Sequence, residues 1–146
     1  MSAEKPRGCR VDGMRLVDVR ASRFEQAIVV VILLAGFVFR ASWSIPTAAA
    51  VALVGVAFGD QSPVVRLWNQ AIAPHRPAAT DFEPAPVART QILLIAGALL
   101  IATLVLLAGS IALASIVAAV VAIVALLGAT GVVNAAAELR RRAQRD

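Results

Sequence analysis

The second half of the chain is dominated by one apolar region, Thr90–Ala137, which contains no charged residue. As a single helix at about 1.5 Å per residue it would be about 70 Å long, more than twice the ~30 Å hydrocarbon core of a bilayer. Gly109 and Ser110 interrupt the region near its middle. The pattern therefore predicts an integral membrane protein whose last two spans, residues 88–108 and 111–134, form a hairpin.

Two shorter apolar runs in the first half predict two more spans. The run Ala27–Phe39 ends at Arg40 and predicts a helix over residues 23–40. A second helix is predicted over residues 44–59, with Pro46 in its first turn. It is short for a span, so a re-entrant or bilayer-thinning segment stays open. A cleaved signal peptide also fits the first run, but Arg40 directly after it and the lack of a clean A-x-A site nearby argue against cleavage.

The start of the first helix contains Ser22 and Glu25 in the S-x-x-E spacing of a capping box. In that motif the serine hydroxyl accepts from a backbone amide of the first turn, and the glutamate reaches back to the amide of the N-cap residue. We expect this role for the pair. A proton-carrying role for Glu25 is the alternative, because ionisable residues in membrane helices often mark function.

The loop between the second and third spans predicts an amphipathic helix over residues 62–73. Ser62-Pro63 has the N-cap and first-turn residues, and Pro74 ends the helix. At 100° per residue its apolar side chains fall on an arc of about 160°. We expect that face to lie in the membrane interface or on a protein partner. Its predicted contact residues are Val64, Leu67, Trp68 and Ile72.

The predicted fold is all-α: a four-helix transmembrane bundle with the interfacial amphipathic helix between helices two and three. The membrane domain covers residues 22–137, between a basic tail over 1–21 and another over 138–146. Small residues recur along two of the spans, where they would let neighbouring backbones approach closely. The predicted packing positions are Gly55, Gly59, Ser110, Ala114, Ala118 and Ala122.

Composition and charge agree with a chain that is embedded in a membrane, and they indicate its orientation. Hydrophobic residues make up 60% of the sequence, and the net charge is +5. Of the 14 lysines and arginines, all except Arg40 fall in the two tails or the central loop, which four spans would place on one side. By the positive-inside rule that side is the cytoplasm, and both termini face it. The basic residues are then headgroup anchors rather than a nucleic-acid surface. The proposed anchors are Arg20, Arg23, Arg66, Arg140, Arg141 and Arg142.

The sequence contains no recognisable catalytic, metal-binding or cofactor-binding motif. It lacks an H-E-x-x-H sequence, a phosphate loop and a Ser-His-Asp set. His75, Asp81 and Glu83 lie in a Pro-rich loop, which does not hold ligands at fixed distances. Cys9 is the single cysteine, so an internal disulfide is excluded, and a reactive thiol there is the remaining redox chemistry. We expect no catalytic residue, no metal and no cofactor.

Several short motifs lie between Val17 and Ile95. They are Val17-Asp18 with Arg23-Phe24, Ser62-Pro63, Ala73-Pro74, and an acidic, Pro-containing link into the third span. In these the chain resembles a small bacterial, largely actinobacterial, membrane family, domain of unknown function 4395. Many members of that family have a cysteine pair near the end of the last helix, and some occur alongside thioredoxin-like or sulfurtransferase proteins. The resemblance therefore implies a redox association, although residues 128–137 contain no cysteine here.

Three classes of function remain open. A non-catalytic scaffold or accessory subunit of a membrane complex is favoured, because the chain has packing surfaces and lacks catalytic motifs. A small oligomeric transporter is the second class; proton-coupled exporters of four helices have an acidic residue deep in a helix, whereas Glu25 and Asp60 lie at the predicted span ends. A membrane partner of a redox system is the third. The expected partners are the lipid bilayer and either another membrane protein or a second copy of the chain.

Overall fold

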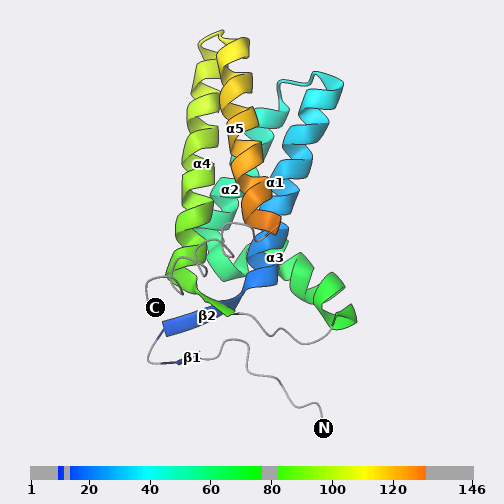
Figure 1. Cartoon of the computed structure of the whole chain (residues 1–146), viewed down its shortest axis with the longest axis vertical. Helices are drawn as coiled ribbons and strands as arrows, with labels where there is room; N and C mark the ends of the chain where they lie inside the picture. The colour runs from blue at the N-terminus through cyan, green and yellow to red at the C-terminus, as the bar shows by residue number, and fades with distance from the viewer. Residues whose placement is uncertain (1–9, 12–13, 77–81, 131–146) are drawn as a thin grey trace, which may run out of the picture.

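Four helices form an upright bundle in the computed structural model (Figure 1), which describes residues 10–11, 14–76 and 82–130. The helices are α1 (Val19–Phe39), α2 (Ser44–Phe58), α4 (Ala85–Leu107) and α5 (Ile111–Thr130). Each packs against two neighbours, in the cyclic order α1, α2, α4, α5. We call the end at which α1 and α4 begin, and α2 and α5 end, the basal end (Figure 1). The helical fold class predicted from the sequence is confirmed in this bundle.

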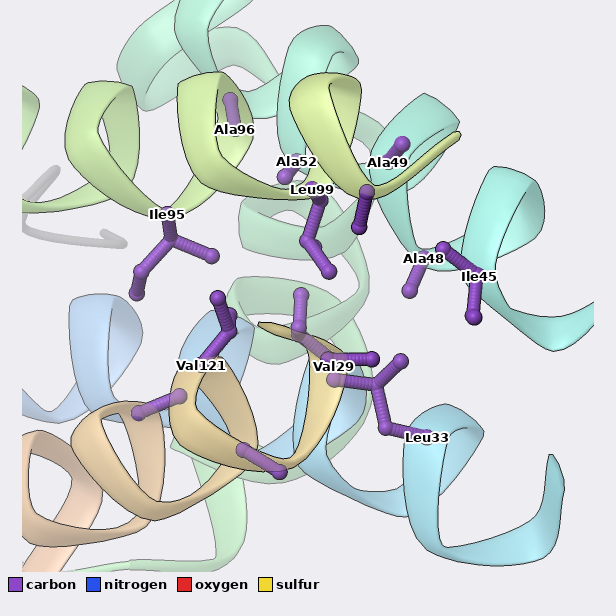
Figure 2. Packing of buried hydrophobic residues seen from close by; sticks show 14 of the residues in the cluster. Val29, Leu33, Ile45, Ala48, Ala49, Ala52, Ile95, Ala96, Leu99 and Val121 are labelled. Carbon is purple, nitrogen blue, oxygen red and sulfur yellow. The ribbon is translucent and has the colours of Figure 1, made fainter. Parts of the chain in front are cut away.

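The interior of the bundle consists mainly of small side chains. Val29 and Leu33 of α1 and Leu99 of α4 are the largest fully buried apolar residues, and they point toward one another across the core (Figure 2). Completely buried alanines surround them and let the helices approach closely. These are Ala48, Ala52, Ala96, Ala102, Ala114, Ala118 and Ala125.

Large apolar side chains lie on the outside of the bundle. Val38 of α1 is 76% exposed, and Leu94 and Leu107 of α4 are 70% and 78% exposed. Water-soluble proteins rarely expose apolar surface so continuously. Small residues inside and large apolar residues outside suit a molecule whose surroundings are hydrocarbon.

Three of the helices are long and apolar enough to cross a membrane: Val19–Phe39, Ala88–Leu107 and Ile111–Thr130. The 15-residue helix α2 is about 22 Å long at 1.5 Å per residue, shorter than the ~30 Å apolar core of a bilayer. It reaches the length of a span only if it is counted together with the helical segment that follows it, and the two are bent by 83°. The expected fourth span is therefore a short helix.

The helical segment after α2, here called the α3 segment, runs from Pro63 to His75. It comprises α3 (Pro63–Leu67), a π-helical turn η2 (Trp68–Ile72) and a 3-10 turn η3 (Ala73–His75), after a short 3-10 turn η1 (Gly59–Gln61). Because the segment turns away from α2 by 83°, it projects to the side at the basal end, beside α1, instead of extending the bundle (Figure 1).

Helix α1 begins earlier than expected, which makes the predicted Ser22–Glu25 capping box wrong. Its first residue is Val19, and the carboxylate of Asp18 accepts a hydrogen bond of 2.9 Å from the backbone amide of Arg20. Asp18 is therefore the N-cap, a role that aspartate fills as well as serine. Ser22 lies within the helix, and Glu25 is left without a capping function.

The turn between α4 and α5 lies where the sequence placed it. Gly109 has φ +91°, a conformation that glycine adopts readily and other residues do not. The apolar region of the second half therefore folds back at Gly109, and the predicted helical hairpin is confirmed.

Short strands at the basal end were not predicted. β2 (Met14–Asp18) pairs antiparallel with β1 (Arg10–Val11) and with β3 (Phe82–Pro84), with Val17 opposite Glu83. The strands join the chain just before α1 to the chain just before α4. This pairing fixes the position of α1 relative to α4 along the bundle axis. The basal ends of both helices contain the polar residues described next.

Candidate functional site

Glu25 lies inside the bundle near its basal end. Its residue exposure is 7%, although it belongs to the first two turns of α1. The carboxyl group occupies the space beside Gly55 of α2, where any side chain at position 55 would collide with Oε1. Gly55 therefore makes room for the carboxyl group of Glu25.

The carboxyl group of Glu25 has one hydrogen-bond partner among the described residues. The hydroxyl of Ser62 donates to Oε1 over 3.5 Å, the outer limit for a hydrogen bond. Within the described part of the chain, no lysine or arginine forms an ion pair with it. A buried carboxyl group with one weak partner is costly to maintain, so its presence calls for a functional explanation.

Ser62 connects this carboxyl group to the α3 segment. It is completely buried, and its Oγ accepts a 3.2 Å hydrogen bond from the amide of Val65 as the N-cap of α3. The same hydroxyl group donates its hydrogen to Glu25. The predicted capping role of Ser62 is confirmed, and its second partner was not foreseen.

A second buried polar contact lies one residue further along α1. Gln26, 3% exposed, donates from Nε2 to Oε1 of Gln91 on α4 over 3.0 Å. Its own Oε1 is enclosed, has no donor among the described residues, and lies against Gly128 of α5. Glu25 and Gln26 thus direct polar groups from α1 toward α2 and α3 on one side and toward α4 and α5 on the other.

The α3 segment docks on α1 through an aromatic pair. The rings of Phe24 and Trp68 are 5.2 Å apart between centroids, and Trp68 also packs with Ala21 and Val65 in a small apolar cluster. Trp68 is 8% exposed, and the indole Nε1 is enclosed without a partner in the described residues. This cluster holds the segment beside Glu25.

The predicted contact face of the α3 segment is only partly available. Trp68 was expected at the membrane interface or on a partner, but α1 covers it, because the segment folds back onto the first turns of that helix. Leu67 is 52% exposed, and Val64 and Ile72 are half-buried. Leu67 is therefore the strongest remaining contact residue of this set.

The predicted packing positions divide into two groups. Ala114, Ala118 and Ala122 lie in the core of the bundle. Gly59 does not pack: it has φ +53°, ends α2, and nothing lies within 4 Å of a Cβ placed there. Ser110 is exposed in the turn before α5. Neither residue serves helix packing, because each lies where a helix ends.

The described basic residues gather at the basal end, apart from Arg40 in the turn between α1 and α2. Arg20 and Arg23 belong to the first turns of α1, and Arg66 is exposed on α3. Arg89 at the start of α4 donates to the carbonyl of Val56 over 3.2 Å. The other predicted anchors, Arg140, Arg141 and Arg142, lie outside the described residues, as does Cys9.

In the part of the chain that the structure describes, no three His, Cys, Asp or Glu residues come together. His75 is exposed, with its Nδ1 3.1 Å from the carbonyl of Ala71. The polar groups inside the basal end were missed by sequence reasoning. The available signal was that Glu25, Gln26 and Gln91 stand at the basal edges of apolar helices, at similar distances from the helix starts.

The fold defines a small helical-bundle protein with three helices suited to cross a membrane. The chain belongs to the family described as a domain of unknown function (DUF4395), whose model matches residues 17–142 and so includes all four bundle helices. Comparison with curated proteins and with solved structures gives no match.

Proposed function

We propose that the protein is a multi-pass component of a bacterial plasma membrane that acts as a non-catalytic scaffold or accessory subunit of a membrane complex. Its four bundle helices cross the bilayer, α2 as a short span, and the α3 segment lies in the cytoplasmic interface. Both termini are cytoplasmic. In this assembly role the protein acts through its contact surfaces rather than through a reactive centre.

The observation that carries the proposal is the inverted distribution of side-chain size. Alanines fill the interior, while residues such as Leu94, Leu104 and Leu107 of α4 are exposed. An apolar exterior of this kind is stable in lipid or against another apolar helix. Because small residues already fill the interior of the bundle, its apolar exterior can bind a partner without rearrangement of the helices.

The positions of the arginines support the orientation. In the described residues, Arg20, Arg23, Arg66 and Arg89 lie at or near the basal end, and Arg40 lies in the turn between α1 and α2 at the other. The positive-inside rule then assigns the basal end to the cytoplasm.

Isolation of the tagged full chain in a mild detergent tests the assembly role, with Leu67→Glu and Asn69→Glu as a matched pair. Both residues are exposed on the α3 segment, but only Leu67 is apolar. The proposal expects a second membrane protein in constant ratio with the wild type and with Asn69→Glu, and several-fold less of it with Leu67→Glu. Recovery of the chain alone as a homo-oligomer would contradict the scaffold role.

A small oligomeric transporter is the second candidate, and one observation favours it: Glu25 is buried in the bundle instead of capping α1 at its surface. Uptake of a substrate by vesicles containing only this protein would distinguish it from a scaffold. Partnership with a thioredoxin-like or sulfurtransferase system is a third proposal and would act through Cys9. It predicts a mixed disulfide that Cys9→Ser abolishes.

A further inference from the structure

We propose that Glu25 is a proton-binding site at the junction of α1, α2 and the α3 segment, with Ser62 as the hydrogen-bond partner of both its protonated and its charged form. The ligand is the proton itself. The site is independent of the proposed assembly role, because it concerns the interior of the bundle and not its surface.

The surroundings of the carboxyl group do not commit it to one protonation state. A carboxylate fixed permanently as a charge is normally paired with a cation or with several donors. Glu25 has neither among the described residues: Gly55 offers no side chain, and Ser62 offers one hydroxyl at 3.5 Å. The group is held in place by packing, while its charge is left uncompensated.

Ser62 can serve the carboxyl group in both states. A hydroxyl has one hydrogen to donate and two lone pairs with which to accept. One lone pair accepts from the amide of Val65, so the hydrogen and the second lone pair remain for Glu25. The hydroxyl donates to the charged carboxylate and accepts from the protonated acid, without loss of the α3 cap.

The site lies where a proton can reach it. Glu25 stands before the strongly exposed apolar part of α1, which begins at Val31 with 64% exposure. Glu25 lies within the first two turns of α1 and keeps a residue exposure of 7%, so a proton reaches it from the basal end without crossing the apolar length of the bundle.

Charged residues occur on most of the elements that pack around the site. On α1 they are Arg20 and Arg23; α2 contains no charged residue. Asp60 belongs to η1, and the α3 segment and the residue after it contain Arg66, His75 and Arg76, which are exposed. Arg89 of α4 bonds the carbonyl next to Gly55. In the part of the chain that the structure describes, neither Arg23 nor Arg89 forms an ion pair with Glu25, so their charges act on it only at longer range.

Modification by dicyclohexylcarbodiimide tests the site, because this apolar reagent adds the O–H of a protonated carboxylic acid across its C=N bond, and the adduct rearranges to a stable N-acylurea without a leaving group. The full chain in lipid vesicles is treated over a series of pH values and digested for mass spectrometry. We expect modification at Glu25 that decreases as the pH is raised, and none at that position in Glu25→Gln. Glu4, Glu83 and Glu138 are internal controls.

Infrared spectroscopy of the same vesicles provides the second measurement, because it does not depend on entry of the reagent. A protonated-carboxyl C=O band should titrate in the wild type and be absent from Glu25→Gln. In Ser62→Ala the charged form should lose more than the protonated form, because a hydrogen bond to a carboxylate is stronger than one to the neutral acid, so that modification at a fixed alkaline pH rises several-fold. Ser62→Thr, which retains the hydroxyl, should behave as the wild type.

Three results would overturn the proposal. One is an infrared spectrum in which no titrating band distinguishes the wild type from Glu25→Gln. Another is equal pH dependence in Ser62→Ala and Ser62→Thr. The third is loss of modification on addition of sodium at constant pH, which would show a metal-cation site. None of these results bears on whether a partner protein is bound, so the scaffold proposal stands or falls separately.

Discussion

Two glycines decide how closely the helices of the basal end approach one another. Gly55 lies against the carboxyl group of Glu25, and Gly128 lies against the amide oxygen of Gln26. In each case α1 supplies a buried polar side chain and a neighbouring helix supplies a position without a side chain. Glycine is required here for space, because both glycines lie within helices and have ordinary helical backbones.

Gly128→Ala should destabilise the bundle, because the new Cβ meets Oε1 of Gln26, whose side chain can move away only by disturbing its hydrogen bond to Gln91. The loss of one such hydrogen bond costs about 1 kcal/mol. Thermal unfolding in detergent measures it. Gly97→Ala is the matched control: Gly97 is in α4, and nothing lies within 4 Å of a Cβ there. The control should be as stable as the wild type or slightly more stable. Equal loss in both variants would show that Gly128 is not a contact position.

The α3 segment is attached to the bundle at two places, by Ser62 at its start and by Trp68 six residues later. The segment is short and exposed along its outer side, so it depends on these contacts rather than on its own helix propensity. One serine, Ser62, therefore both caps α3 and forms a hydrogen bond with the carboxyl group of Glu25. Movement of the segment and the environment of Glu25 are therefore linked.

Trp68→Ala should loosen the α3 segment and leave the bundle intact. Truncation of a buried tryptophan to alanine costs about 3 to 5 kcal/mol, which corresponds to a rise of about a hundredfold or more in local opening. Hydrogen exchange of peptides from residues 63–76 is the measurement. Trp43→Ala is the control, because Trp43 is 66% exposed at the other end of the bundle. Unchanged exchange in Trp68→Ala would mean that the aromatic pair does not hold the segment.

Elements with a strong periodic or compositional signal were predictable from the sequence. The turn at Gly109 and the N-cap at Ser62 follow from local chemistry, and the structure has both. The cap of α1 was misplaced because Asp18 and Ser22 are both good N-cap residues, and the sequence alone does not choose between them. The strands were missed because their pairing joins Val17 to Glu83, far apart in the chain.

The interior of the candidate site was beyond prediction for a related reason. An amphipathic pattern showed that Trp68 belongs to an apolar face, but not that this face folds back on Phe24. Likewise, a glutamate at the edge of an apolar helix is equally compatible with the surface and with the interior. Only the bend of 83° after α2, which brings Ser62 over the end of the bundle, decides that Glu25 is enclosed.

At the scale of the whole molecule, a bundle with alanine inside and large apolar residues outside has one end rich in arginine. Arg40 at the opposite end is the exception in the described residues. The central claim is that this bundle crosses the membrane with the basal end in the cytoplasm. That claim determines which side supplies protons to Glu25 and which side meets a partner at Leu67.

Labelling of single cysteines with a membrane-impermeant maleimide tests the claim most directly. In a Cys9→Ser background, Ser42→Cys places a thiol in the exposed turn between α1 and α2, and Gln70→Cys places one on the exposed side of the α3 segment. In intact spheroplasts we predict that position 42 reacts and position 70 does not, and that both react once the membrane is opened. Reaction at position 70 in intact spheroplasts, or protection of position 42, would contradict the orientation on which the account depends.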